Sequence, residues 1–339
     1  MNVLLTSVGR RAYLVHYFRQ ALAGRGQVFA ANCRADVPGM QVADEAFVVP
    51  PSHDPEYVGT IIRLCREYRV GLLCSCHDLD TLALARERAR FEEAGIAAML
   101  PTPEWARLCL DKFEGGQRLR EAGFAVPWST LSLAEATSAV ARGEAGFPLL
   151  IKSRFGFGSL GQAVCRDMDE LEWLYRRAVA DQRESDIGHF INTPPEQRVL
   201  VQAHVAGPEW CLVLVNDPNG RHAAHFVTEV HRMRAGESDR ATTLPPDVLG
   251  DLPERLAALI GHSGIWGIDL RMGGGRPAII DLNPRFAGDY PFQHLAGANV
   301  PAALVAWALG EEPDPAWLRS EAGVTGYKDL VPRRERRAE

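Results

Sequence analysis

Residues 278–285 read Ala-Ile-Ile-Asp-Leu-Asn-Pro-Arg, an apolar run with two oxygen-bearing side chains near its end. Side chains two residues apart on a strand point to the same face, so Asp281 and Asn283 are predicted to lie side by side. Mg²⁺ prefers such oxygen ligands and usually also contacts the phosphates of a substrate. Arg285, two residues beyond Asn283, is placed to face the same phosphates. This stretch therefore predicts a magnesium and phosphate site on a β-sheet.

A second strand is predicted just before this one. Residues 264–270 are mostly apolar and contain Asp269, and the Met-Gly-Gly-Gly stretch at 272–275 is typical of a hairpin turn. In an antiparallel hairpin, Asp269 adds a third oxygen donor beside Asp281. Carboxylates next to an apolar run are costly to bury without a cation, which favours a metal site over a structural pair.

A lysine and a glycine-rich segment lie in the middle of the chain. Lys152 ends an apolar strand and is followed by Gly156, Gly158 and Gly161. Glycines allow backbone N–H groups to approach phosphate oxygens closely. The lysine precedes the loop, so the segment is not a Walker A motif. A short strand predicted at 162–165 indicates instead a β-hairpin lid over the phosphates.

The first hundred residues alternate between strand and helix patterns. Apolar runs predict strands at 3–6, 28–31, 46–49 and 70–75, and helical patterns fall at 12–22, 57–68 and 80–94. This rhythm predicts a parallel sheet with helices on both faces. Only one glycine follows the first strand, where a dinucleotide fingerprint has three, so an NAD-dependent oxidoreductase is disfavoured.

Polar residues follow two of these strands. Ligands of parallel sheets bind at the carboxyl ends of the strands. The candidate substrate residues at this rim are Ser7, Arg10, Arg11, His77, Asp78 and Asp80. An arginine there suits a carboxylate and an aspartate suits an ammonium group, which indicates an amino acid substrate. The alternative for each residue is a structural turn at the end of a strand.

Prolines at 101 and 103 mark a boundary after this region. A helix is predicted at 105–122, a polar loop at 181–197 and further strands from residue 199. The arginine-rich and acidic stretch 229–239 is predicted to be an anion-contacting loop, with a charged hairpin as the alternative. We expect three domains, at 1–100, 101–198 and 199–339.

The strand at 199–202 ends in a turn. Backbone groups after Gln202 are suited to the edge of an adenine, and Glu209 is suited to ribose hydroxyls. On these residues alone, a plain strand–turn–strand is the favoured interpretation.

Taken in order, these motifs resemble the ATP-grasp superfamily, and within it the carboxylate–amine ligases similar to the large subunit of carbamoyl phosphate synthetase. The resemblance covers nearly the whole chain. It implies an α/β fold (α+β in the ATP-binding part): a Rossmann-like pre-ATP-grasp sheet, a lid subdomain and a C-terminal catalytic subdomain.

The resemblance also implies roles for individual residues, with ATP and Mg²⁺ as cofactors. The residues implied to contact the nucleotide are Lys112, Lys152, Gly156, Gly158, Gln202, Ala203, Val205 and Glu209. The implied metal ligands are Asp269, Asp281 and Asn283. Arg285 and Arg234 are implied to contact the transferred phosphoryl group. Two positions depart from the family. Ala203 stands where relatives often have glutamate, and Asp269 where some have glutamine or glutamate.

The implied reaction is ATP-dependent ligation of a carboxylate to an amine through an acyl phosphate, with release of ADP and phosphate. The alternatives are a phosphoryl-transfer enzyme and a non-catalytic nucleotide-binding module. The partners implied are small molecules and a possible homodimer.

Composition excludes several other classes. Lys and Arg number 37 and Asp and Glu 43, a net charge of −6, so no nucleic acid or membrane surface is an expected partner. No apolar run reaches the ~18 residues of a membrane helix. The seven cysteines are expected to be reduced thiols of a cytoplasmic protein. The Cys74-Ser-Cys76-His77-Asp78 cluster lacks metal-site spacing and favours a buried strand end.

Overall fold

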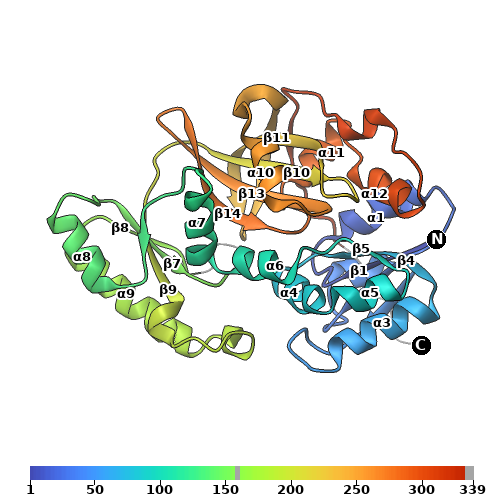
Figure 1. Cartoon of the computed structure of the whole chain (residues 1–339), viewed down its shortest axis with the longest axis horizontal. Coiled ribbons are helices and arrows are strands. Elements are labelled where there is room, and N and C mark those ends of the chain that lie inside the picture. Colours follow the sequence, from blue (N-terminus) through green and yellow to red (C-terminus); the bar gives the residue numbers. More distant parts are fainter. Residues whose placement is uncertain (157–160, 333–339) are drawn as a thin grey trace.

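The computed structural model describes residues 1–156 and 161–332, and the N-terminal strands form the predicted parallel sheet (Figure 1). Its strand order is β3-β2-β1-β4-β5. The strands are β1 (Asn2–Thr6), β2 (Val28–Asn32), β3 (Glu45–Val48), β4 (Val70–Ser75) and β5 (Ala97–Ala98). Four of them were expected, and the two-residue β5 is too short to show a hydrophobic pattern. β1 and β4 are neighbours, so their carboxyl ends lie together at one rim.

The helices of this sheet are α1 (Ala12–Leu22), α2 (Pro38–Val42), α3 (Tyr57–Glu67), α4 (Asp78–Arg86) and α5 (Arg88–Glu93). The single helix predicted at 80–94 is wrong. The backbone of Glu87 has ψ 21°, which ends α4 and starts α5. α4 also begins two residues early, because the His77 ring accepts a hydrogen bond from the Leu79 N–H and caps the helix.

A helical connector leads to the lid. It consists of α6 (Pro103–Leu110) and α7 (Lys112–Glu121), where one helix was predicted. Asp111 has an extended backbone, and its carboxylate caps α7 and pairs with Arg154 of the lid. The break at Asp111 therefore turns α7, and Lys112 at its start, toward the lid.

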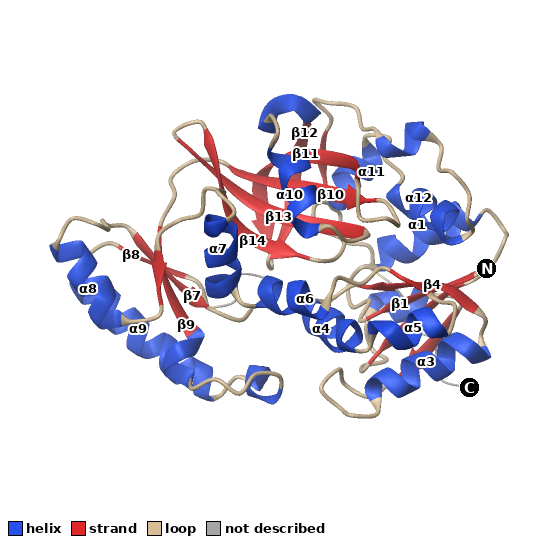
Figure 2. Cartoon of the chain, viewed as in Figure 1, coloured by secondary structure: helices blue, strands red, loops and turns tan. Residues whose placement is uncertain are grey.

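The lid is a four-stranded sheet with order β6-β9-β7-β8, covered on one face by two helices (Figure 2). The elements are β6 (Ser129–Thr130), β7 (Leu149–Ser153), β8 (Ala163–Cys165), β9 (Val199–Ala203), α8 (Leu133–Ala141) and α9 (Met168–Arg183). β9 pairs with β7, so the division between sheets falls after Ala203 and not at 198. The loop predicted at 181–197 contains the end of α9 and two short helices, η1 (Asp186–His189) and η2 (Pro195–Arg198).

The C-terminal domain is built on a six-stranded sheet with order β14-β13-β10-β11-β12-β15. Its strands are β10 (Glu209–Asn216), β11 (His222–Arg234), β12 (Glu237–Leu244), β13 (Gly264–Gly273), β14 (Arg276–Asn283) and β15 (Thr325–Tyr327). Its helices are α10 (Leu252–Ile260), α11 (Tyr290–Leu295), α12 (Val300–Ala308), η3 (Pro246–Leu249) and η4 (Pro315–Leu318). The stretch 229–239 is a strand hairpin, so the predicted loop is wrong and the charged-hairpin alternative holds.

The C-terminal sheet packs against the N-terminal domain. Leu14 and Phe18 of α1 share one buried apolar cluster with Leu304 and Val305 of α12. This packing holds the rim of the parallel sheet beside the β13–β14 hairpin. All seven cysteines lie in the described ranges and are free thiols, as expected. Among the described helices, none is long and apolar enough to cross a membrane.

Candidate nucleotide and metal site

The β13–β14 hairpin brings the predicted metal ligands together. Asp269 pairs directly with Asp281, and the Asn283 amide nitrogen lies 3.5 Å from an Asp269 carboxylate oxygen. The turn at Gly274 and Gly275 has φ values of 57° and 78°, which side chains with a Cβ rarely adopt. The predicted hairpin and its shared face are therefore confirmed.

Two lysines face this carboxylate pair. The Lys112 ammonium donates to Asp281 and to the Gly156 carbonyl, each at 2.6 Å. Lys152 is only 6% exposed, and burial lowers its pKa to about 8 while Asp281 and Asp269 act to raise it. Both lysines thus concentrate positive charge between the lid and the hairpin. Gly158 lies outside the described residues.

The surroundings of Asp269 suit a cation. Burial, with the nearby charges of Asp281 and Glu209, raises the pKa of Asp269 to about 7. A divalent cation would remove this repulsion, and the donors are carboxylate and amide oxygens, which Mg²⁺ prefers. The residues therefore fit Mg²⁺, with Asp269, Asp281 and Asn283 as the holding set.

This pKa predicts that Mg²⁺ binding releases a proton. Below pH 7 the folded protein keeps Asp269 protonated, so Mg²⁺ must displace that proton, whereas above pH 7 the carboxylate is already charged. We expect about one proton released per Mg²⁺ at pH 6 and close to none at pH 8.5. Calorimetric titration in two buffers of different ionisation enthalpy measures this number. Equal release at both pH values would contradict the assignment, and Asp269→Asn should abolish the release.

Arg285 links the hairpin to the rim of the parallel sheet. Its guanidinium donates to Asp78 at 3.0 Å and to the Asn283 side-chain oxygen at 2.9 Å. Both side chains of the Arg285–Asp78 pair are about nine-tenths buried. The pair lies 207 residues apart in sequence, so its existence was not predicted. It places a fixed positive charge beside the predicted metal ligands.

The two rim aspartates have different surroundings. Asp80 has no exposed surface and accepts hydrogen bonds from Thr6, Tyr57 and Ser75. Its carboxylate is therefore a structural anchor between β1 and β4, and the expected contact with a substrate ammonium is not available. Asp78, by contrast, has one buried carboxylate oxygen with no hydrogen-bond partner among the described residues.

The basic rim residues lie against the C-terminal domain. Arg10 donates to the Ala235 carbonyl at the tip of the β11–β12 hairpin. Arg11 donates to the Phe286 carbonyl and lies 3.5 Å from Glu237. Ser7 adopts a left-handed backbone (φ 49°) where β1 ends. These contacts hold the rim of the parallel sheet against the tip of the β11–β12 hairpin.

Arg234 lies on this hairpin and not on the metal strands. It forms an ion pair with the buried carboxylate of Asp239 and donates to the Lys328 carbonyl. Among the described residues, Arg234 forms no hydrogen bond or ion pair with Asp281 or Arg285. Its predicted role at the γ-phosphate stays a prediction.

The predicted adenine-binding residues border a pocket between α7 and the two sheets. This small pocket is lined by Lys112, Gln202, Ile280 and Asp281, together with neighbouring residues of α6 and α7. The Ala203 N–H donates to the Trp128 carbonyl and the His204 N–H to the Pro148 carbonyl, so neither is free for the predicted adenine contact. The Glu209 carboxylate pairs with Arg271 at 2.6 Å, a partner that was not predicted. Arg271 lies two residues after Asp269 on β13, so both side chains point to the same face of the sheet. This spacing was the signal in the sequence that could have indicated Arg271.

Three family models match this chain along its length. Residues 3–99 match the PylC-like N-terminal domain, residues 111–207 match the ATP-binding domain of the carbamoyl-phosphate synthase L chain, and residues 195–329 match a family described as ATP-grasp in the biosynthetic pathway with Ter operon. These matches follow the chain in the order of its three sheets. The chain belongs to the ATP-grasp superfamily.

Curated relatives and solved structures agree with that class. Formate-dependent phosphoribosylglycinamide formyltransferases match over 76% of this chain, at 25% identity in Corynebacterium jeikeium and 23% in Burkholderia mallei. The chain spans only 62% and 63% of their lengths. The biotin carboxylase domain of Hydrogenobacter thermophilus 2-oxoglutarate carboxylase, solved as a dimer with MgADP and bicarbonate, has a TM-score of 0.71 at 20% identity, covering 92% of this chain and 70% of that one.

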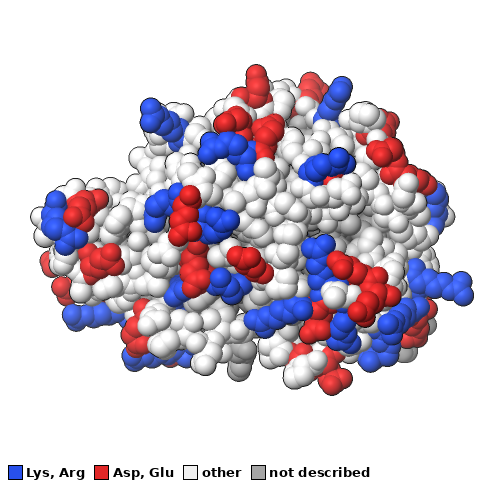
Figure 3. Space-filling model, in the orientation of Figure 1, with Lys and Arg blue, Asp and Glu red and all other residues white. Residues whose placement is uncertain are grey.

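A second structure, Staphylococcus aureus N5-carboxyaminoimidazole synthetase, has a TM-score of 0.67 at 13% identity and covers 93% of this chain and 78% of that one. These likenesses establish the pre-ATP-grasp and ATP-grasp fold. Figure 3 shows positive and negative side chains interspersed over the viewed face, without a large region of one sign.

Proposed function

We propose that this protein is an ATP-dependent ligase that activates a carboxylate as an acyl phosphate and joins it to an amine. The observation that carries the proposal is the arrangement of Asp269, Asp281 and Asn283 around one point, with Arg285 and two lysines beside it. Mg²⁺ bound there would neutralise phosphate charge. The matched relatives include a formate-dependent enzyme, which is consistent with carboxylate activation.

The chain's residues would act mainly by positioning and by charge. A carboxylate oxygen attacks the γ-phosphorus of ATP as the bond to the β–γ bridging oxygen breaks, which gives an acyl phosphate and ADP. Lys112 and Lys152 would hold the phosphates, and Arg285 would face the transferred group. The amine lone pair then attacks the acyl carbon, phosphate leaves with the carbon–oxygen bonding electrons, and the amine loses a proton.

We propose an amino acid as one substrate. Arg10 and Arg11 lie at the rim near the phosphoryl-binding residues, and the Arg11 side chain is largely buried there. Asp78 remains as the candidate contact for an ammonium group, through a buried carboxylate oxygen that accepts no hydrogen bond from the described residues, so this contact requires the Arg285–Asp78 region to open. A homodimer and a cytoplasmic location belong to the same proposal.

A hydroxylamine trap tests the reaction class. Purified protein is incubated with Mg-ATP, hydroxylamine and pooled amino acids and small carboxylic acids, and mass spectrometry reads the products. We expect a hydroxamate together with ADP, because hydroxylamine captures acyl phosphates. ADP with a phosphorylated product and no hydroxamate would support the phosphoryl-transfer alternative. Nucleotide binding without turnover would support a non-catalytic module.

A further inference from the structure

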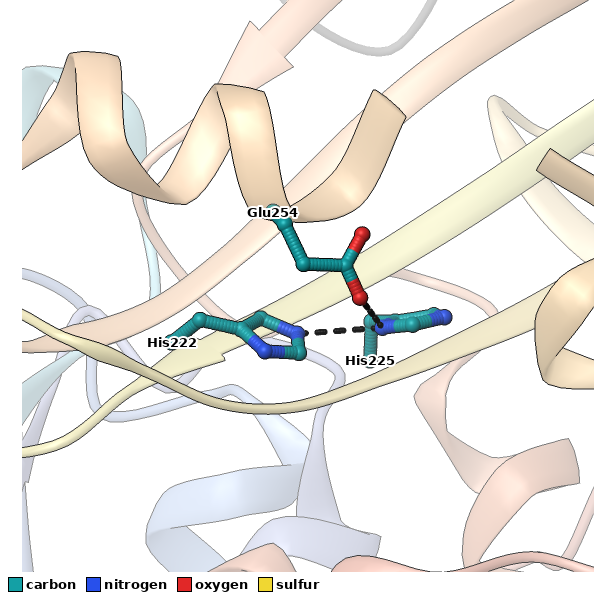
Figure 4. A group of neighbouring side chains, drawn as sticks. All are labelled: His222, His225 and Glu254. Carbon is teal, nitrogen blue, oxygen red and sulfur yellow. Dashed lines mark hydrogen bonds and ion pairs between the residues drawn. The ribbon is translucent and has the colours of Figure 1, made fainter. Parts of the chain in front are cut away.

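Two histidines and a glutamate converge on the C-terminal domain without any part in the nucleotide site (Figure 4). We call His222, His225 and Glu254 the His–His–Glu cluster. The Nε2 atom of His222 lies 3.0 Å from Nδ1 of His225, and Glu254 Oε1 lies 3.8 Å from that same Nδ1. The donor atoms all lie within 4.8 Å of one another. Sequence analysis missed this cluster, because Glu254 lies on α10 and both histidines on β11.

A β-bulge creates the cluster. His222 and His225 are three residues apart, so on a regular strand they would point to opposite faces. The register between β10 and β11 shifts here, because Asn216 pairs with His222 while the adjacent Val215 pairs with Ala224. One extra residue of β11 is therefore inserted, and it turns both imidazoles to one side. Bulges of this kind commonly re-aim a side chain at functional positions.

A hydrogen bond orients the His225 ring. Its Nε2 atom lies 2.9 Å from the Pro246 carbonyl oxygen, which can only accept, so Nε2 carries the hydrogen. The Nδ1 lone pair of His225 is then directed into the cluster. Histidines that bind metal ions almost always donate their other N–H in this way, which fixes both tautomer and ring orientation.

The cluster is separate from the nucleotide site. His225 pairs with Leu214, which packs with Leu256 of α10 in one apolar cluster. Asp269 pairs with Cys211, which belongs to the apolar cluster shared with the N-terminal domain. The two groups of side chains therefore lie on opposite faces of the six-stranded sheet.

We propose that the His–His–Glu cluster binds a borderline divalent metal ion, with Zn²⁺ as the ion that fits best. Ligand bonds of about 2.1 Å place two tetrahedral donors about 3.4 Å apart, between the two distances seen here. Two imidazoles select Zn²⁺ over Mg²⁺, which prefers oxygen ligands. Three protein ligands leave one position for water. The ion would tie the start of β11 to α10 and, through His225, to η3.

Zinc titration in the presence of excess Mg²⁺ tests the proposal, since Mg²⁺ occupies the oxygen site and does not compete for imidazoles. A chromogenic zinc chelator reports stoichiometry and affinity on the full chain. We expect one Zn²⁺ per chain and a higher Tm. His225→Ala and Glu254→Gln should each weaken binding about tenfold or more.

Matched variants decide the result. His262→Ala removes a histidine at the same end of the sheet and should bind Zn²⁺ like the natural protein. Asp281→Asn disables the proposed magnesium site and should also leave zinc affinity unchanged, so failure of the proposed function would not alter this outcome. Circular dichroism checks that each variant is folded. Absence of zinc binding by the natural protein, or equal binding by His225→Ala and His262→Ala, would show that the histidines form only a hydrogen-bonded pair.

Discussion

Replacing Asp281 by asparagine is expected to lower kcat by about a hundredfold to a thousandfold, the range seen when one group that stabilises transition-state charge is removed. Asp281 lies at the centre of the site, since it pairs with Asp269 across the hairpin and binds Lys112 at 2.6 Å. Asparagine keeps the shape of the side chain but not the charge that holds Mg²⁺. Steady-state ADP release measures the effect.

The fold of the Asp281→Asn variant should survive. Burial is the main cause of the raised Asp269 pKa and the Asp281 charge is the next, so neutralising Asp281 relieves repulsion in the metal-free protein. Lys112 keeps its bond to the Gly156 carbonyl. Thermal unfolding should therefore give a Tm close to that of the natural protein. Glu312→Gln, an exposed carboxylate change after α12, is the matched control and should retain full activity. Near-normal turnover by Asp281→Asn would refute the metal assignment.

Replacing Arg285 by glutamine should damage both catalysis and stability. We expect kcat to fall roughly a thousandfold, because arginines that neutralise a transferring phosphoryl group contribute about this much or more. The free energy of unfolding should also fall by about 3 kcal/mol, since the buried Asp78 carboxylate loses its guanidinium partner at 3.0 Å. Turnover assays and urea denaturation measure the two effects.

Two further variants separate these effects. Arg285→Lys keeps a positive charge, so stability should be largely retained, but a single ammonium cannot reproduce the contacts to Asp78 and Asn283 together and kcat should stay low. Arg285→Gln combined with Asp78→Asn removes the unpaired charge and should recover stability without activity. If the double variant recovers both, Arg285 has only a structural role.

The metal hairpin was predictable because its signal is local. Strand alternation alone places Asp281 and Asn283 on one face, and a glycine turn that begins five residues after Asp269 sets the register. The parallel sheet was predictable for the same reason, since four of its five strands, β1 to β4, carry their own apolar runs. Local patterns of this kind depend on the neighbouring residues and not on distant packing.

The remaining features depend on contacts between distant residues. The break between α6 and α7 follows from the pairing of Asp111 with Arg154, 43 residues further on. Asp80 looks like a rim carboxylate in sequence, but Tyr57 from a separate helix covers it. The bulge that joins His222 to His225 has no signature in the spacing of its residues. These features could be identified only from the folded structure.

Transfer of an oxygen atom from the carboxylate to phosphate tests the central claim most directly. The carboxylic acid identified by the hydroxylamine trap is prepared with a heavy oxygen isotope in its carboxyl group and supplied with Mg-ATP and the amine. An acyl phosphate requires one labelled oxygen to appear in the inorganic phosphate, with the label absent when Asp281→Asn replaces the natural protein. Unlabelled phosphate formed together with amide product would contradict the proposed mechanism.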